Sequence, residues 1–263
     1  MFGSNSRIHS SERGVLRHRD ANIRGIADLL KNLKKHVGQS DVVWFRGQSD
    51  KAWGLVPSLA RDLGKHLPKE GAIYKRFIQN ATQLMDHSPL DEWGWLFVMQ
   101  HHRAPTRLLD WTEGPLVALY FATANAAYDN KDGALWCLDP IALNRQANVS
   151  FAYELELPSF RDKVLENYLP SRVDPKSPMN PVAAIGPRAT KRMAAQIGTF
   201  TVNHTMHQPI ESLYDGKHVW KYVIPKENKA EIRLELARLG YSALSLFPDI
   251  DEVAELIHRE YLK

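Results

Sequence analysis

The sequence predicts a single compact α+β domain in which a central mixed sheet is flanked by helices. The apolar share of 44% and the charged share of 24% are those of an ordinary globular protein. Segments typical of strands and of helices follow one another irregularly, which favours an α+β fold over a regular alternating parallel one. The segment 116–127 is apolar nearly all round and therefore predicts a helix at the centre of the core.

Composition divides the chain into two regions. Residues 1–20 are polar and basic, and we expect a flexible arm there, followed by one folded domain over residues 21–263. A net charge of +4 and a pI near 9.0 allow an anionic partner such as nucleic acid but do not require one.

Cysteine content and hydropathy exclude several classes of protein. The single cysteine, Cys137, excludes an intramolecular disulfide and a multi-cysteine metal site. No apolar run reaches the roughly 18 residues that a membrane-spanning helix needs. The N-terminus shows no apolar signal region. We therefore expect a cytoplasmic protein without a membrane partner.

The first elements are predicted from periodicity. Apolar residues between 23 and 33 fall on one face of an amphipathic helix, and Gly38 suits its C-terminal end. Residues 42–45, Val-Val-Trp-Phe, predict a buried strand that Arg46, Gly47 and Gln48 follow. Helices are predicted over 70–86 and 91–101, and Pro105 ends the second.

The later elements are predicted in the same way. Residues 106–112 predict a short strand or extended turn, and Pro115 suits the first position of the central helix. The remaining predictions are strands over 133–139, 198–203 and 218–224, a short helix near 160–168, and helices over 229–239 and 251–262.

Two segments, 44–48 and 100–112, are predicted to build one polar functional site. Arg46 and Gly47 at the end of a buried strand place a guanidinium beside backbone that a ligand can approach closely. Arginine can bind a phosphate through two parallel hydrogen bonds. The alternative is that Arg46 pairs with Asp50 or Asp110.

The second segment concentrates polar residues between two apolar helices, where such groups must be paired or exposed in a cleft. Its adjacent His101 and His102 point different ways on a helix, and no third ligand lies at suitable spacing, so no metal site is predicted. The sequence contains no nucleophile elbow, no phosphate loop and no Gly-rich dinucleotide fingerprint.

Several strings of residues resemble the FRG family, named for its Phe-Arg-Gly motif. They are Phe-Arg-Gly-Gln at 45–48, Gln-His-His at 100–102, Pro-Thr-Arg-Leu-Leu-Asp-Trp-Thr at 105–112 and Ala-Leu-Tyr-Phe-Ala at 118–122. Arg192 and the segments 196–200 and 246–249 resemble its C-terminal pattern. Arg103 departs from the pattern, because the family usually has Gly there. Small bacterial FRG proteins resemble toxins or anti-phage effectors, which implies that role here, with an antitoxin protein as partner.

The order of an Arg-bearing strand, a Thr-bearing strand, an apolar helix and a Gly-opened strand is also similar to the ADP-ribosyltransferase fold. This resemblance implies NAD as co-substrate and a nucleic acid (RNA or DNA) or a protein as acceptor. It implies catalytic roles for Arg46, His101, Asp110 and Gln196. It further implies NAD contacts from Arg46, Gly47, Gln48, Thr106, Arg107, Trp111, Thr112 and Tyr120.

One departure from the transferase pattern concerns the late Glu that such enzymes often carry. Gln196 stands in the matching region, and the spacing of Glu154, Glu156 and Glu231 selects none of them. Asp110 is then the candidate for the negative charge that stabilises a cationic transition state. Two alternatives stay open: an NAD glycohydrolase with water as acceptor, and a non-catalytic module that binds a nucleotide or nucleic acid.

Overall fold

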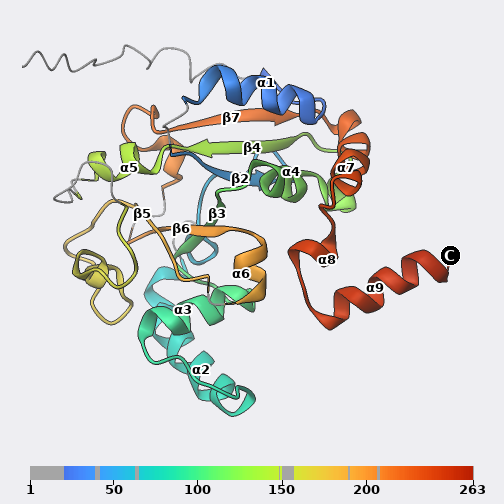
Figure 1. Cartoon of the computed structure of the whole chain (residues 1–263). Coiled ribbons are helices and arrows are strands. Elements are labelled where there is room, and N and C mark those ends of the chain that lie inside the picture. Colours follow the sequence, from blue (N-terminus) through green and yellow to red (C-terminus); the bar gives the residue numbers. More distant parts are fainter. Residues whose placement is uncertain are drawn as a thin grey trace, which may run out of the picture.

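The computed structural model describes residues 21–38, 42–62, 65–147, 149, 157–188, 190–205 and 208–262, without the side chains of residues 259 and 260. The basic arm, residues 1–20, lies outside the described residues, as do Glu154 and Glu156. Within the described part, the expected α+β class with a central mixed sheet is confirmed (Figure 1). None of the helices in this part combines the length and apolar character that a membrane span requires.

One sheet organises the described chain, with the strand order β1-β7-β4-β2-β3-β6-β5. β1 runs parallel to β7, and the other neighbouring strands are antiparallel. The strands are β1 (Ala21–Asn22), β2 (Trp44–Gln48), β3 (Leu108–Thr112), β4 (Gly133–Leu138), β5 (Val182–Ala184), β6 (Gly198–Val202) and β7 (Val219–Ile224).

Most predicted helices have a counterpart in the described chain. Asp91 begins the predicted 91–101 helix as its N-cap, because its carboxylate accepts a hydrogen bond from the amide of Gly94 at 2.7 Å. The elements α5, α6, α8, β1 and β5 have no counterpart among the predicted ones. The helices are α1 (Ile26–His36), α2 (Glu70–Ala81), α3 (Glu92–His101), α4 (Pro115–Thr123), α5 (Pro140–Gln146), α6 (Lys191–Ala195), α7 (Lys229–Arg238), α8 (Ala243–Leu246) and α9 (Ile250–Tyr261).

The segment predicted as a strand over 42–45 is β2, which continues to Gln48. The ladder with β4 runs on through Arg46↔Trp136 and Gln48↔Ala134, so Arg46 lies inside the sheet rather than beyond the strand end. β2 is also a central strand, because it pairs with β4 on one side and with β3 on the other. Arg46 therefore lies in a central strand of the sheet.

Helices cover one face of the sheet in two groups. α1, α4 and α7 pack on β2, β4 and β7, with Leu29, Leu119 and Ile232 fully buried among the strand residues. α3 packs on β3, β5 and β6 through a second cluster that includes Leu96 and Phe200. The predicted central helix is confirmed as α4, although it ends at Thr123. The functional cavity described below lies on this face, between the two groups.

The opposite face of the sheet is packed by tryptophans. Trp44, Trp111 and Trp136 come from adjacent strands and form one buried cluster with Leu143 of α5. Side chains alternate between the two faces along a strand, so Asp110 and Thr112 point away from Trp111 and toward the α3 and α4 side. This alternation directs the side chains of Asp110 and Thr112 toward the cavity, whereas the Trp111 indole packs in the opposite cluster.

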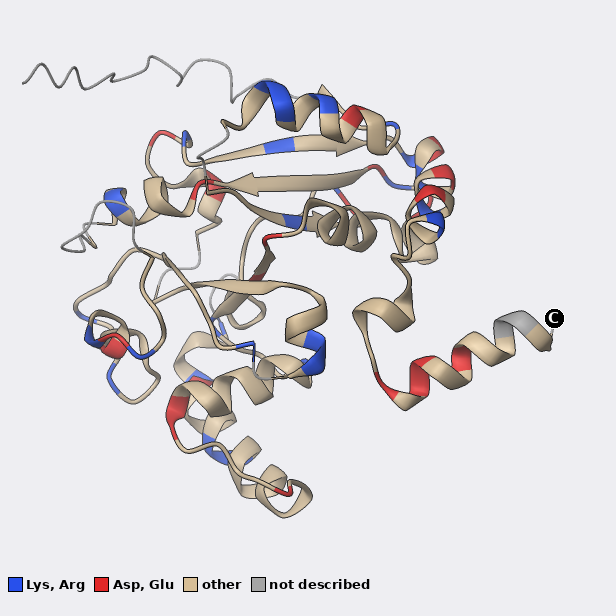
Figure 2. Cartoon of the chain, in the orientation of Figure 1, with Lys and Arg blue, Asp and Glu red and all other residues tan. Residues whose placement is uncertain are grey.

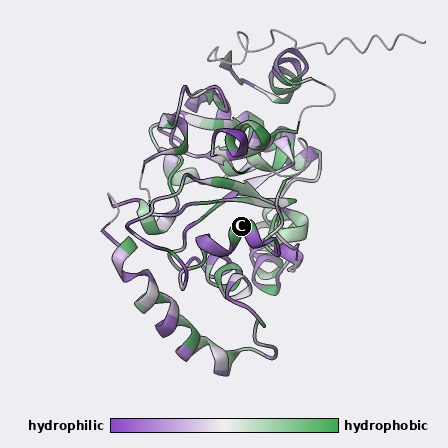
Figure 3. Ribbon diagram, turned by 90° about the vertical axis from the view of Figure 1, so that its left-hand side faces the viewer, coloured by the Kyte–Doolittle hydropathy of each residue, from purple (hydrophilic) through white to green (hydrophobic). Residues whose placement is uncertain are grey.

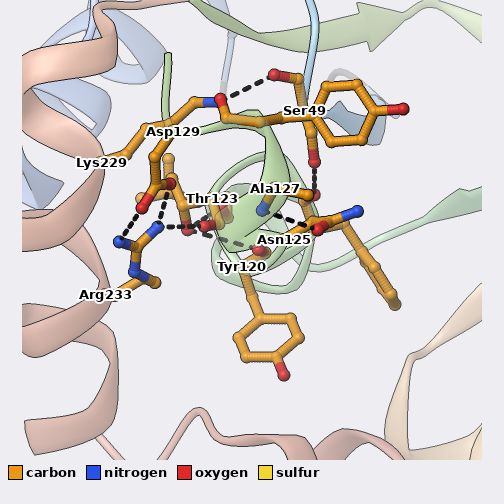
Figure 4. A network of polar contacts seen from close by, with 11 residues as sticks. Ser49, Tyr120, Thr123, Asn125, Ala127, Asp129, Lys229 and Arg233 are labelled. Atoms are coloured by element: carbon orange, nitrogen blue, oxygen red, sulfur yellow. Dashed lines mark hydrogen bonds and ion pairs between the residues drawn. The ribbon is translucent and has the colours of Figure 1, made fainter. Parts of the chain in front are cut away.

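A polar network fixes α4 against β2 and α7 (Figure 4). The buried ammonium of Lys229 donates to the carbonyls of Ser49 at 2.7 Å and Tyr128 at 2.8 Å. Arg233 donates to the carbonyl of Thr123 at 2.7 Å and forms an ion pair with Asp129. Cations at the C-terminal end of α4 also suit its helix dipole. The network holds in place the helix that supplies one wall of the cavity.

The last helix, α9, extends away from the sheet (Figures 1 and 3). Its surface mixes exposed apolar residues, such as Ile250 and Ile257, with acidic ones. Figure 2 shows this acidic character and the contrasting Lys and Arg residues of α6. Leu246 of α8 and the following Phe247 contact the cavity wall.

Candidate functional site

A cavity of about 200 Å³ opens between the two helix groups, above β2 and β3. The two segments singled out from the sequence both reach it, and so do α4, α6 and β6. Its walls combine aromatic residues with charged and amide side chains. The lining residues are Phe45, Arg46, Gly47, Phe97, Gln100, His101, Asp110, Trp111, Thr112, Phe121, Arg192, Met193, Gln196 and Phe200.

Arg46 occupies a split in the sheet. β2 and β3 pair only at Phe45↔Thr112 and then diverge. The guanidinium of Arg46 crosses the split and donates from Nη1 to the backbone carbonyl of Asp110 at 2.5 Å. Its Nε is buried and makes no hydrogen bond within the described chain. The expected alternative, an ion pair with Asp50 or with the Asp110 carboxylate, does not occur among the described contacts.

The electrostatics of Arg46 suit an anionic ligand. Burial lowers the pKa of Arg46 below its ordinary value, the charge of Asp110 opposes this shift, and Arg61 adds to it. A partly buried cation without a carboxylate partner is costly, since the interior solvates charge poorly. An anion bound at Arg46 would remove that cost.

A chain of hydrogen bonds fixes the carboxylate of Asp110. Asp110 is the exposed residue of an otherwise buried β3, and its Oδ2 accepts from Nε2 of Gln100 at 2.6 Å. The hydroxyl of Thr106 donates to Oε1 of Gln100 and accepts from the amide of Leu108 at 3.2 Å. Thr106 is fully buried and does not line the cavity. Its position indicates that it orients Gln100, which in turn orients Asp110.

His101 and Arg192 form the wall next to α6. Nη1 of Arg192 donates to the carbonyl of His101 at 3.4 Å, and its guanidinium lies 4.6 Å from the centre of the Phe247 ring. Burial lowers the pKa of His101, with Arg192 and His102 acting in the same direction and Asp249 against them. The His101 imidazole is therefore neutral at neutral pH and able to accept a proton.

Thr112 and Gln196 join β3 to the turn before β6. The hydroxyl of Thr112 donates to the carbonyl of Gln196 at 2.6 Å and accepts from the amide of Gly114 at 3.0 Å. The side-chain amide of Gln196 donates to the carbonyl of Leu246 at 3.0 Å. Both residues line the cavity, and these contacts tie it to α8.

Besides Thr106, three residues proposed from the sequence to contact NAD do not line this cavity. Arg107 is buried against Glu70 of α2 and also donates to the carbonyls of Asn203 at 3.0 Å and His204 at 3.3 Å. Gln48 accepts from the indole of Trp136 at 2.7 Å and donates to the carbonyl of Gly54 at 3.2 Å. Tyr120 is not among the lining residues, and its neighbour Phe121 points into the cavity instead.

Of the lining residues outside segments 44–48 and 100–112, five were not proposed as site residues: Phe97, Phe121, Arg192, Met193 and Phe200. Within these segments, Phe45 and Gln100 were not named individually either. Phe97 stands three positions before Gln100, which is the spacing of one helix face. Arg192 belongs to the C-terminal string that resembles the FRG pattern. The other walls come from elements that are distant in sequence, and no local pattern marks them.

The buried pair of Glu70 and Arg107 leads to a stability prediction. Glu70→Ala is expected to lower the free energy of unfolding by about 3–5 kcal/mol, because it leaves the Arg107 guanidinium buried without its counter-charge. Urea denaturation followed by circular dichroism measures this. Glu113→Ala removes one partner of an exposed pair with Arg188 and should cost less than about 1 kcal/mol. Equal costs for the two variants would contradict the interpretation.

Arg103 occupies the left-handed region that the FRG pattern reserves for Gly. Its φ is +60° in the turn after α3, where the amide of Ala104 donates to the carbonyl of Met99 at 2.9 Å. Arg103→Gly should therefore raise the free energy of unfolding by about 1 kcal/mol, since glycine adopts this conformation without steric cost. Arg103→Ala keeps the strained backbone and serves as the control. A glycine variant that unfolds at a lower urea concentration than wild type would refute this account.

Comparison with known proteins gives one match. The FRG domain family model matches residues 41–131, a range that includes Arg46, Gln100 and Asp110. α6 and β6, which complete the cavity, lie beyond it. No match was found among curated proteins or among solved structures. In the part of the chain that the structure describes, no group of three His, Cys, Asp or Glu residues is arranged to hold a metal ion.

Proposed function

We propose that this protein, of which residues 41–131 match the FRG domain family model, is an ADP-ribosyltransferase-like enzyme that uses NAD as co-substrate. One observation carries the proposal: a cavity with aromatic walls holds Arg46, which lacks a carboxylate partner, close to the oriented carboxylate of Asp110. NAD has an anionic diphosphate, which an arginine can bind, and a cationic nicotinamide riboside, which a carboxylate can stabilise.

Arg46 is the proposed diphosphate ligand. Arg46 lines the cavity, and a guanidinium can bind two phosphate oxygens at once through parallel hydrogen bonds. The aromatic rings of Phe97, Phe121 and Phe200 supply the faces on which the nicotinamide ring packs.

Asp110 is the proposed catalytic carboxylate. The bond between C1′ of the ribose and the nicotinamide nitrogen breaks, and its electron pair neutralises the positive charge of the pyridinium ring. Positive charge then develops on C1′ and the ring oxygen of the ribose, where the carboxylate of Asp110 stabilises it. Gln100 and Thr106 act as positioning residues, because they hold that carboxylate in one orientation.

His101 is the proposed acceptor of the proton that the incoming nucleophile loses. The nucleophile forms a new bond to C1′ and releases a proton, which the neutral imidazole can take up. Thr112 and Gln196 fix the wall beside Arg192, because the backbone amide of Gln196 also donates to the Arg192 carbonyl at 2.9 Å.

The composition of the chain favours a nucleic acid as acceptor of the ADP-ribose group, with protein as the alternative. The net charge of +4 and the pI near 9.0 support association with an anionic polymer. A toxin or anti-phage role follows from the FRG resemblance. Expression of the protein is then expected to arrest growth, and Arg46→Ala should relieve the arrest while the protein still folds.

The proposal is tested by incubating the purified protein with NAD labelled in the adenylate moiety, together with RNA, DNA or protein. Nicotinamide release with transfer of label identifies a transferase and its acceptor. Release without transfer identifies the glycohydrolase alternative. Binding of NAD without turnover identifies a binding module, and the absence of both binding and turnover refutes the NAD site altogether.

A further inference from the structure

A second cavity, of about 500 Å³, adjoins the first, and we call it the second lobe. The two lobes share Arg46, Gly47 and Phe121, so that Arg46 stands at their junction. The remaining walls come from the end of β2 and the segment that follows it. They are Gln48, Ser49, Ala52, Trp53, Gly54, Val56 and Arg61.

The charged groups lining the second lobe are both cationic. Arg61 lies near enough to Arg46 to lower the pKa of that residue. Within the described residues, the Arg61 side chain forms no ion pair and donates only to the carbonyl of Val56 at 3.4 Å. No acidic residue lines this lobe in the described part of the chain. Two adjacent guanidiniums without an anion repel each other, and a bound phosphate would bridge them.

The same lobe presents an aromatic surface. Trp53 is 43% exposed, and its ring meets that of Tyr128 edge-on with centroids 5.0 Å apart. An exposed indole next to two arginines combines a stacking surface for a base with ligands for a phosphate. These are the two chemical features by which a nucleotide is recognised.

The backbone around Trp53 is held rigidly before any ligand binds. The side-chain amide of Gln48 donates to the carbonyl of Gly54, and the carboxylate of Glu211 accepts from the amide of Leu55 at 3.0 Å. The amide of Ala52 donates to the carboxylate of Asp50 at 2.9 Å. A preorganised segment loses little conformational entropy when it binds a ligand. This explains why Gln48 contributes to the lobe although both ends of its side chain are occupied.

We infer that the second lobe binds the adenylate half of the dinucleotide, with the base against Trp53 and the phosphate between Arg46 and Arg61. That the base is adenine rests on the proposed function. That the second lobe binds a nucleoside phosphate follows from its own residues. The nicotinamide riboside then lies in the first lobe, next to Asp110.

The test is calorimetric titration of the full chain with AMP and, separately, with nicotinamide mononucleotide. Arg61→Ala and Trp53→Ala should each weaken AMP binding about 10-fold or more, the range observed for loss of one stacking or phosphate contact. Both variants should bind nicotinamide mononucleotide as wild type does. Trp53→Phe keeps a ring and should retain most of the AMP affinity. Arg76→Ala, an exposed arginine of α2 outside the lobe, is the matched control.

The outcomes separate this inference from the proposed function. Wild-type protein that binds no AMP, or variants that bind it unchanged, would overturn the inference. NAD turnover with a KM that neither variant alters would overturn it as well, yet leave the enzyme assignment intact. AMP binding that depends on Trp53 and Arg61, in a protein that never cleaves NAD, would support the lobe and refute the transferase.

Discussion

Asp110→Asn is expected to lower kcat for nicotinamide release by about 10²–10³-fold while NAD still binds. Asparagine has nearly the shape of aspartate, and its carbonyl can accept the hydrogen bond that Nε2 of Gln100 donates. The variant therefore keeps the geometry of the cavity and removes only the negative charge. The negative charge of Asp110 stabilises the positive charge that develops on the ribose in the transition state. Removing it should therefore lower kcat and leave KM nearly unchanged.

Two further variants serve as controls for the role of the Asp110 charge. Glu113→Gln removes a carboxylate of the same chain that follows β3 but does not line the cavity, and its kcat should equal that of wild type. Gln100→Ala leaves the Asp110 charge in place without its orienting hydrogen bond and should give an intermediate kcat. An Asp110→Asn enzyme with unchanged kcat would show that another group stabilises the transition state.

The contrast between Arg46 and Arg107 shows what the sequence could predict about the site. Both arginines belong to strings typical of the FRG family, and both were proposed as NAD ligands. Arg46 lies in a split between two strands and lines two cavities. Arg107 is sealed against Glu70, a residue 37 positions earlier in the chain. The partner of a buried arginine depends on tertiary packing, and no spacing within the motif reveals it.

The fold was easier to predict than the walls of the site. β4 is a contiguous apolar run, β7 is apolar except for Lys221, and α4 is apolar on nearly all sides, so local patterns determine them. The short elements α6 and β5 carry no such pattern, because three to five residues are too few for a periodicity. α6 supplies Arg192, which explains why this residue was missed as a site residue.

Gly47→Ala is expected to destabilise the protein by at least about 3 kcal/mol, and to prevent folding if the native stability is modest. A Cβ at Gly47 would lie 1.8 Å from the carbonyl oxygen of Ala118 and 2.6 Å from the amide nitrogen of Ala122. Both atoms belong to the backbone of α4, so no side-chain rotation can relieve the clash. The sequence was interpreted as leaving this backbone open to a ligand, but the bare face of Gly47 is needed for the close approach of α4 to β2.

Gly71 provides the matched control for this variant. It lies in α2, and a Cβ there would meet nothing within 4 Å. Gly71→Ala should therefore raise the free energy of unfolding by about 1 kcal/mol, since alanine favours a helix over glycine. Urea denaturation of both variants measures the difference, and a Gly47→Ala protein as stable as wild type would refute the packing account. A large loss at Gly47 alone would show that the glycine of the Phe-Arg-Gly motif serves the contact between β2 and α4. The adjacent Arg46 would then be the charged residue of this motif that lines the cavity.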